Sequence, residues 1–322
     1  MTVLDTPTIR DAVELACHAP SLYNSQPWKW VAHGSRLELF AVPDPQVQST
    51  DRSGRELLLS CGAVLDHLRV AIAAASWYTT VRRFPDADDP HHLATCDFER
   101  SAVEPAHRQR AEAILRRRTD RLPFAAPPDW QATEAVLRSA AGQSDVTLDV
   151  IPDDGRRQLA EASRLTEDIR RHDPTYQSEL RWWTSPFEFD QGLPSSSRLS
   201  ESEAARVDIA RAFPTTGYGR RRPQVESDRS KVVVLSTRGD TSDEVLRCGE
   251  ALSAVLLECT LAGLATCTLT HMIEVAPARE LIRGLIRRNR RPQLLIRVGT
   301  PVGQQPPATP RRPLGEVLEF GE

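Results

Sequence analysis

The sequence has no Cys-x-x-Cys pair, which removes the commonest cysteine-based metal and redox motifs from consideration. Its six cysteines stand singly inside mostly apolar stretches, at Cys17, Cys61, Cys96, Cys248, Cys259 and Cys267. We therefore expect reduced core residues. Histidine adds no metal motif, because His91 and His92 are adjacent and cannot both face one ion, as helical residues four apart can. We expect no metal site.

The sequence also lacks the motifs of the common nucleotide and hydrolase sites, namely G-x-G-x-x-G, G-x-x-x-x-G-K-[ST] and G-x-S-x-G. Any cofactor must be held in another way. A net charge of -3 gives no reason to expect nucleic acid or an anionic membrane as partner. No apolar run approaches the roughly 20 residues that span a bilayer. Since Met1–Arg10 also lacks a signal-peptide pattern, we expect a cytoplasmic protein.

What the sequence does contain is a weak internal repeat. With 322 residues, 40% of them hydrophobic, the chain is long enough for about two domain-sized units. Helical periodicity predicts long apolar helices over Arg55–Ser76 and Asp243–Ala262. At an offset of 187 (248 minus 61), Cys61-Gly62 falls on Cys248-Gly249. Two unrelated helices of similar composition are the alternative, but the order of the surrounding elements favours a repeat.

Each half is predicted to hold an early helix, a strand, the long helix and further strands. The expected shorter elements are the helices Thr8–His18 and Trp130–Ala141, a hairpin of Trp28–Trp30 and Leu37–Val42, and strands over Trp77–Arg82, Val146–Ile151, Lys231–Thr237 and Leu294–Val298. The halves are expected to meet near Ser101–Gln109, so we divide the chain into residues 1–107 and 108–322.

An insertion over residues 172–222 makes the second half longer. Its aromatic residues are Trp182, Trp183, Phe187 and Phe189, and a polar stretch follows them. Disorder is an alternative for the middle of the insertion, but clustered aromatic residues predict that one end packs on something. We interpret the insertion as a candidate lid.

Two arginine clusters are candidates for binding a phosphate. Arg116–Arg121 reads Arg-Arg-Arg-Thr-Asp-Arg, and guanidinium groups match phosphate oxygens bidentately. Pro310–Leu314 holds two further arginines. For either cluster alone, a solvated basic segment or a weak nucleic-acid contact is the alternative. The two clusters become informative if the fold brings them together.

Two segments of another kind accompany the arginines. The loop Pro20–Trp28 carries Asn24 and Gln26, which can each donate and accept hydrogen bonds, as a polar ring system requires. A well-packed structural loop is the alternative. Gly263–His271 is either part of a site or only a helix end followed by a core strand, and a lone His271 is more often structural than catalytic.

Together these segments resemble the FMN-dependent nitroreductase family, in which four patterns recur: R-x-S-x-[KR], P-S-x-x-N-x-Q-P-W, G-L-[GA]-T-C and R-[KR]-P-L. Here they read Arg117–Arg121, Pro20–Trp28, Gly263–Cys267 and Arg311–Leu314. The whole chain also closely resembles the Acg-type nitroreductase-like proteins of mycobacteria. The resemblance implies an α+β, nitroreductase-like fold in which two fused repeats form an intramolecular pseudo-dimer with a lid-like insertion.

Because family members are usually homodimers with FMN at the interface, the resemblance also implies site residues. The residues implied against the isoalloxazine are Pro20, Ser21, Leu22 and Asn24. The residues implied at the phosphate and ribityl chain are Arg117, Arg118, Thr119, Arg121 and Arg311. Backbone groups of Leu269, Thr270 and His271 are implied near the ring. No catalytic side chain is nominated.

The implied number of sites is one FMN per chain. The second half has Ala140–Gln143 where a second P-S-x-x-N loop would fall, and the first half lacks an arginine segment before its first helix. A pseudo-dimer already contains the two subunits that the family needs, so we expect a monomer.

The activity implied is NAD(P)H-dependent reduction of nitro compounds or quinones. Thr119 replaces the usual serine and keeps its hydroxyl, whereas Thr270-His271 replace smaller residues and would narrow the substrate slot. The alternative is a non-catalytic protein that stores or sequesters FMN beneath a closed lid, with Trp182, Trp183 or Phe187 in the space of the nicotinamide.

Overall fold

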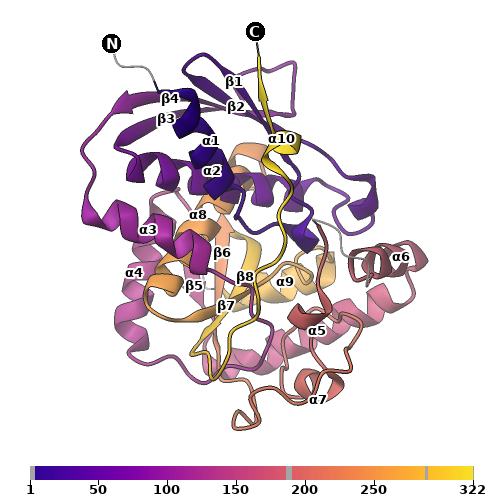
Figure 1. Ribbon diagram of the computed structural model, residues 1–322. Helices are drawn as coiled ribbons and strands as arrows, with labels where there is room; N and C mark the ends of the chain where they lie inside the picture. The colour runs from indigo at the N-terminus through magenta and orange to yellow at the C-terminus, as the bar shows by residue number, and fades with distance from the viewer. Residues whose placement is uncertain (1–3, 186–190, 287–288, 322) are drawn as a thin grey trace.

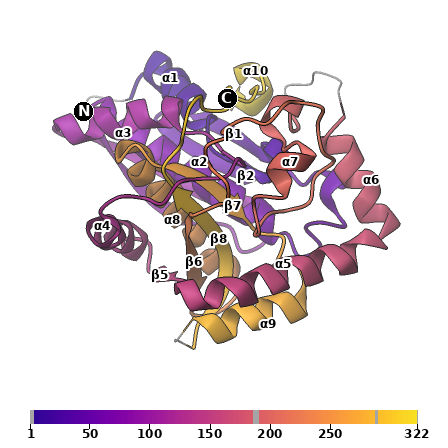
Figure 2. The ribbon, with the colours of Figure 1, turned by 90° about the horizontal axis from the view of Figure 1, so that it is seen from below.

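The computed structural model describes residues 4–185, 191–286 and 289–321, which form two sheets with two long helices between them (Figures 1 and 2). The first sheet has the order β3-β4-β2-β1-β9 and the second the order β5-β6-β8-β7. The strands are β1 Trp28–His33, β2 Arg36–Ala41, β3 Trp77–Arg83, β4 His92–Arg100, β5 Thr147–Val150, β6 Lys231–Thr237, β7 Ala265–Leu269, β8 Arg291–Gly299 and β9 Leu318–Phe320.

The helices divide between the two sheets and the insertion. They are α1 Thr6–Ala16, α2 Arg55–Ala74, α3 Pro105–Arg116, α4 Trp130–Gly142, α5 Arg156–Arg171, α6 Pro174–Trp183, α7 Glu201–Ala204, α8 Ser242–Leu261, α9 Ala276–Leu285 and α10 Leu314–Val317. One core cluster joins α1 and α2 to the first sheet, and a second joins α4 and α8 to one face of the second sheet. A third covers the other face of that sheet with α5 and α9, which lie side by side in Figure 2.

The two sheets have the same topology, because β3-β4-β2-β1 corresponds strand by strand to β7-β8-β6-β5. The correspondence extends to an irregularity in the ladder. The pairing of β2 with β4 shifts between Leu39 and Phe40, and the pairing of β6 with β8 shifts between Leu235 and Ser236. A bulge at the same place in both sheets is a specific feature. It shows that the chain contains two copies of one α+β unit, as the sequence predicted.

The long helices repeat with the offset read from the sequence, since both have 20 residues and Arg55 and Ser242 are 187 apart (242 minus 55). Each is followed by a residue in the left-handed region, Ser76 with φ 69° and Gly263 with φ 71°. A glycine or polar residue with positive φ commonly ends a helix. The first long helix is therefore slightly shorter than the predicted Arg55–Ser76.

The two long helices cross at their paired glycines. A Cβ on Gly62 would lie 2.0 Å from the carbonyl oxygen of Leu246, and one on Gly249 would lie 2.2 Å from that of Leu59. Leu59 and Leu246 are themselves 187 apart (246 minus 59), so the contact is reciprocal, like the self-complementary interface of a two-fold dimer. The predicted Cys-Gly alignment therefore marks the place where the two halves pack against each other in space.

The C-terminal segment returns to the first half. After β8 the chain runs back across the molecule, and β9 pairs in parallel with β1, with Trp30 opposite Leu318 (Figure 1). The strand that closes the first sheet therefore comes from the end of the chain.

The insertion holds α6 and α7, and its aromatic end packs on the first half. Trp183 is buried against Tyr23, Tyr176 and Leu180, and its indole nitrogen donates to the carbonyl oxygen of Gln46 at 2.8 Å. Trp182 is 54% exposed. The predicted packing of one aromatic end is thus observed for Trp183, whereas Phe187 and Phe189 lie outside the described residues.

All six cysteines are free and buried, as predicted. The expectation that no apolar stretch approaches a bilayer-spanning length needs correction. Within the described residues, α2 is long and apolar enough, by length and composition alone, to cross a membrane. Most of its apolar stretch is buried inside the molecule, where α2 packs on α8.

Candidate functional site

Two adjoining cavities lie between the halves. The larger one, of about 520 Å³, is lined by the loop after α1, the start of α2, the strand β7 and part of the insertion. The smaller one, of about 190 Å³, is lined by the same loop, by the segment after α3, and by residues 307–309 and 311 of the segment between β8 and α10, which we call the C-terminal arm. Four residues line both cavities, namely Pro20, Ser21, Thr119 and Arg121.

The structure brings most of the predicted site residues together here. Leu22, Leu269 and Thr270 line the larger cavity, and Asn24, Arg117, Arg118 and Arg311 line the smaller one. His271 lines neither. His271 lines a third cavity of about 260 Å³, which shares residues 210–213 with the lining of the larger cavity. The Nε2 atom of His271 is 3.0 Å from the hydroxyl of Ser163.

The smaller cavity has a strong excess of positive charge. None of its four guanidinium groups, from Arg117, Arg118, Arg121 and Arg311, makes an ion pair with a carboxylate of the described residues. The Nε and Nη1 atoms of Arg117 and the Nε of Arg311 are buried without a hydrogen-bond partner. Unpaired buried donors of this kind are rare in folded proteins.

The charges of these arginines also act on one another. Burial, and then the nearby Arg311, lower the pKa of Arg117 to about 9, far below the usual value for arginine. Burial lowers the pKa of Arg311 to about 10. Both groups stay protonated at neutral pH, so the cavity keeps a charge that only a bound anion would neutralise.

The loop between α1 and β1 is held in an unusual conformation. Tyr23, Asn24 and Gln26 have φ values of 52°, 62° and 50°, in the left-handed region that residues with side chains seldom adopt. Such conformations persist only where the surroundings enforce them, and they cluster at functional sites. The backbone N–H of Gln26 donates to the Ser21 hydroxyl at 3.0 Å, and the backbone N–H of Leu22 donates to the Ser60 hydroxyl at 3.2 Å.

The C-terminal arm also fixes this loop. Arg311 donates to the side-chain oxygen of Asn24 at 3.1 Å, while the Asn24 amide donates to the carbonyl of Pro310 at 3.1 Å. The backbone of Arg312 donates to the side-chain oxygen of Gln26 at 2.9 Å. The two motifs, nearly 300 residues apart in the chain, therefore form one hydrogen-bonded unit at the smaller cavity.

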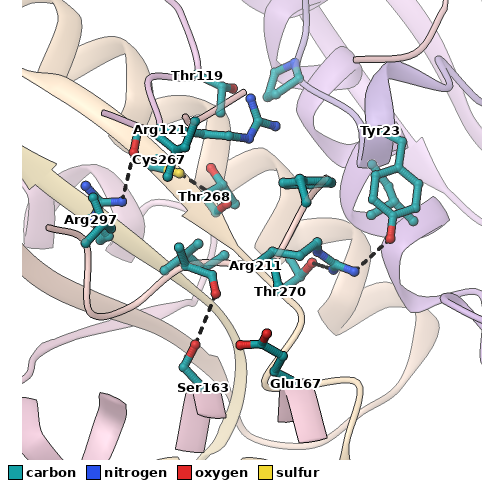
Figure 3. Close-up of a pocket in the computed structure, with 18 of the residues that line it drawn as sticks. Tyr23, Thr119, Arg121, Ser163, Glu167, Arg211, Cys267, Thr268, Thr270 and Arg297 are labelled. Carbon is teal, nitrogen blue, oxygen red and sulfur yellow. Dashed lines mark hydrogen bonds between the residues drawn. The ribbon is translucent and has the colours of Figure 1, made fainter. Parts of the chain in front are cut away.

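The insertion forms one wall of the larger cavity, through residues between Leu199 and Thr215. Arg211 is its main anchor, since it donates to the hydroxyl groups of Tyr23 at 2.8 Å and of Thr270 at 3.2 Å (Figure 3). Arg211 also pairs with Glu274. Trp182 and Trp183 are not among the lining residues. The predicted lid thus contacts the cavity, but through Arg211 and Phe213 in place of the tryptophans.

Sequence reasoning missed several residues of the larger cavity. Arg297, on β8, pairs with Asp228 at 2.9 Å and donates to the carbonyl of Leu122, which fixes the segment that carries Arg121. Glu56, at the start of α2, is a buried acid of the cavity wall. None of these belongs to a local motif, so only the fold could reveal them.

Comparisons with known proteins add relatives over the whole chain. No family model matches. A Mycobacterium tuberculosis protein named "Putative NAD(P)H nitroreductase acg" is 53% identical over 320 residues, covering 98% of this chain and 97% of that protein. Another protein of the same organism, whose name also begins "Putative NAD(P)H nitroreductase", is 36% identical over 322 residues, covering 99% of this chain and 93% of that protein.

Solved structures give weaker matches. An FMN-dependent nitroreductase from Mycobacterium smegmatis in complex with NADPH has a TM-score of 0.42 and 19% identity, covering 67% of this chain and 99% of that one. A nitroreductase with bound FMN from Desulfitobacterium hafniense has a TM-score of 0.43 and 10% identity, covering 66% and 98%.

Proposed function

The chain belongs to the NAD(P)H nitroreductase family, together with the Acg protein of Mycobacterium tuberculosis, and from this premise we propose that it is an FMN-dependent oxidoreductase. Its electron donor is NAD(P)H, and its acceptors are nitro compounds or quinones. FMN binds at one site, formed by the two adjoining cavities between the halves.

The observation that carries this proposal is the uncompensated charge in the smaller cavity. A phosphate monoester has the charge and the acceptor oxygens that Arg117 and Arg311 lack, because three of their buried nitrogen atoms have no partner. The hydroxyl of Thr119 adds a donor at the boundary between the cavities. The residues present therefore fit the phosphate end of FMN.

The larger cavity fits the ring end. When bound, FMN supplies the redox chemistry, taking a hydride from the nicotinamide and passing electrons to the acceptor. The protein's part is to hold the ring between Pro20–Leu22 and the end of β7, at Leu269 and Thr270. Preorganised hydrogen-bond donors and cations beside the ring stabilise the negative charge of the reduced flavin without moving during the reaction.

The two halves contribute differently to the single site. We assign residues 1–107, with the loop Pro20–Asn24, to the first half and residues 108–322, with the arginines and the lid, to the second. The six reduced cysteines are consistent with a cytoplasmic location. The insertion, anchored by Arg211, would act as a lid that restricts access to the ring.

The decisive experiment is to mix the purified yellow protein anaerobically with NADPH and with NADH while following the flavin absorbance. Rapid bleaching that a nitroaromatic or a quinone reverses is the expected result. If dithionite bleaches the flavin but neither nicotinamide does, the oxidoreductase proposal fails and FMN storage beneath the lid becomes the better account. If no flavin copurifies or can be added back, the cofactor assignment itself fails.

A further inference from the structure

One carboxyl group that lines the larger cavity is buried and paired with the neighbouring Arg55. Glu56 is the second residue of α2, is 3% exposed and lines the cavity beside Leu59 and Ser60. An acid in the first turn of a helix is stabilised by the partial positive charge of the unpaired backbone amides there, and those amides can also be satisfied by a side chain that precedes the helix. Here Asp51 does so, accepting from the amides of Glu56 at 3.0 Å and Leu57 at 2.8 Å. The carboxyl of Glu56 is left to face the cavity and Arg55.

The surroundings of Glu56 favour its protonated form. Burial raises the pKa of Glu56 to about 7, and the nearby carboxylates of Glu274 and Asp51 act in the same direction. Arg55, which pairs with Glu56, and Arg211 from the insertion oppose the rise in its pKa without cancelling it. From α8, the thiol of Cys248 faces the same region, and burial raises the pKa of that thiol to about 12, so it adds no charge. A carboxyl group that gains and loses a proton near neutrality is suited to general acid chemistry.

The other two acids of this cavity differ from Glu56. Glu167, on α5, lines the cavity (Figure 3) but is exposed, and Asp208 is exposed and paired with Arg156 at 2.7 Å. Glu56 is therefore the buried acid among the described lining residues, and it lies on the same wall as the loop that is proposed to hold the ring. Glu167 offers a matched control, since it lines the same cavity without being buried.

We propose that Glu56 is the proton donor to the electron acceptor bound in the larger cavity. This inference rests on the proposed function. With a quinone as acceptor, one carbonyl oxygen receives a hydride equivalent that originates from NAD(P)H, which leaves the other oxygen anionic. The O–H bond of Glu56 then breaks, an O–H bond to that oxygen forms, and the hydroquinone leaves. Glu56, now a carboxylate, regains a proton from water.

The test separates this step from nicotinamide oxidation. The FMN-loaded protein is reduced anaerobically with dithionite and mixed with benzoquinone, which needs protons, or with ferricyanide, which accepts electrons alone. Glu56→Gln is expected to slow reoxidation by benzoquinone about 100-fold, the low end for loss of a general acid, and to leave the ferricyanide rate unchanged. Glu167→Gln, at an exposed acid of the same cavity, is expected to leave the ratio of the benzoquinone rate to the ferricyanide rate unchanged. The benzoquinone rate of the wild type should fall as pH rises through about 7, because the donor is then ionised.

A second readout needs no turnover. Infrared difference spectra of the FMN-loaded protein, recorded below and above neutral pH, should contain a protonated-carboxyl band that Glu56→Gln removes and Glu167→Gln keeps. If Glu56→Gln does not retain FMN, Glu56→Asp replaces it, and a shifted pH midpoint is expected. Equal benzoquinone rates for the Glu56 and Glu167 variants, an unchanged pH midpoint, or the absence of the band would overturn the inference. Failure of NADPH and NADH to bleach the flavin would instead overturn the proposed function, while the dithionite experiment still decides the role of Glu56.

Discussion

Buried arginines without carboxylate partners are the residues of this chain that most restrict its ligand. Arg117 and Arg311 come from segments that the sequence already marked as phosphate-binding candidates, and the fold brings both to one cavity. Their hydrogen bonds to the carbonyl of His18, at 3.1 and 3.0 Å, hold them in place but leave their charge unneutralised. Charge and geometry therefore both favour an anionic ligand there.

We predict that Arg117→Ala combined with Arg311→Ala abolishes FMN binding in a protein that still folds. Loss of two charge-assisted contacts, each worth about 1.5–3 kcal/mol, lowers affinity by roughly 100-fold or more. The FMN-free variant should melt close to FMN-free wild type, because the removal of two unpaired buried charges offsets the loss of the hydrogen bonds that Arg311 makes to Asn24 and His18. Fluorescence titration with FMN and thermal melting measure the two effects.

Arg312→Ala is the matched control for this double variant. Arg312 is adjacent to Arg311 but pairs with Glu316 at 3.3 Å and lines neither cavity. Its replacement should leave the affinity for FMN nearly unchanged. Full retention of FMN by the double variant would reject the phosphate assignment.

Residues outside motifs could not be predicted from the sequence. Arg211 and Tyr23 are 188 positions apart (211 minus 23), and nothing local indicates that their side chains meet at 2.8 Å. Glu56 looks like an ordinary acid in the first turn of a helix until the fold shows that Asp51 caps that helix. Arginine motifs are readable because their composition is unusual, whereas a single buried acid has no such signature.

At the scale of elements, hydrophobic periodicity identified the helices and strands that bury one face. The predicted β6 has its observed bounds, and the predicted start of α2 is also correct. Periodicity gave no indication of β9, because three residues that pair with a distant strand leave no local pattern. The expected junction at Ser101–Gln109 falls on the start of α3, whose first residue is Pro105.

The crossing of α2 and α8 gives a prediction at this scale. Gly62→Ala would place a methyl group 2.0 Å from the backbone oxygen of Leu246, where no side-chain movement can relieve the clash. We expect a loss of about 3 kcal/mol or more in the free energy of unfolding, since overpacking usually costs 1–3 kcal/mol and here the opposing atom is backbone. Chemical denaturation of the FMN-free protein measures the change.

Gly142→Ala provides the comparison. Gly142 ends α4, and a Cβ there would meet nothing within 4 Å. Replacing this glycine should leave stability unchanged or raise it by about 0.5–1 kcal/mol, because alanine loses less conformational entropy in a helix. Equal stabilities of the two variants would show that the helices do not pack through Gly62.

At the scale of the whole molecule, the predicted repeat is confirmed by the matching strand order, the shared bulge and the equal long helices. The sequence indicated the repeat through a few identities. It could not show that the C-terminal arm crosses to the first sheet, because such an exchange depends on tertiary pairing.

We predict a monomer that binds one FMN per chain. The reciprocal contact of α2 with α8 already satisfies, within one chain, the interface that separate subunits would form. Light scattering coupled to size exclusion should give the mass of a single chain, 35.9 kDa plus cofactor. Flavin released by denaturation should approach one equivalent; a value near two would contradict the single-site arrangement.

The near-symmetry of the two long helices has an evolutionary consequence. In a homodimer every mutation is expressed twice, at both copies of a site, so neither copy can specialise alone. In a fused duplication each mutation occurs once. The counterpart of Glu56 at the 187 offset is Asp243, which lies at the surface and pairs with Arg247 at 2.7 Å. The position at this offset is thus a buried acid in one half and a half-exposed helix residue in the other.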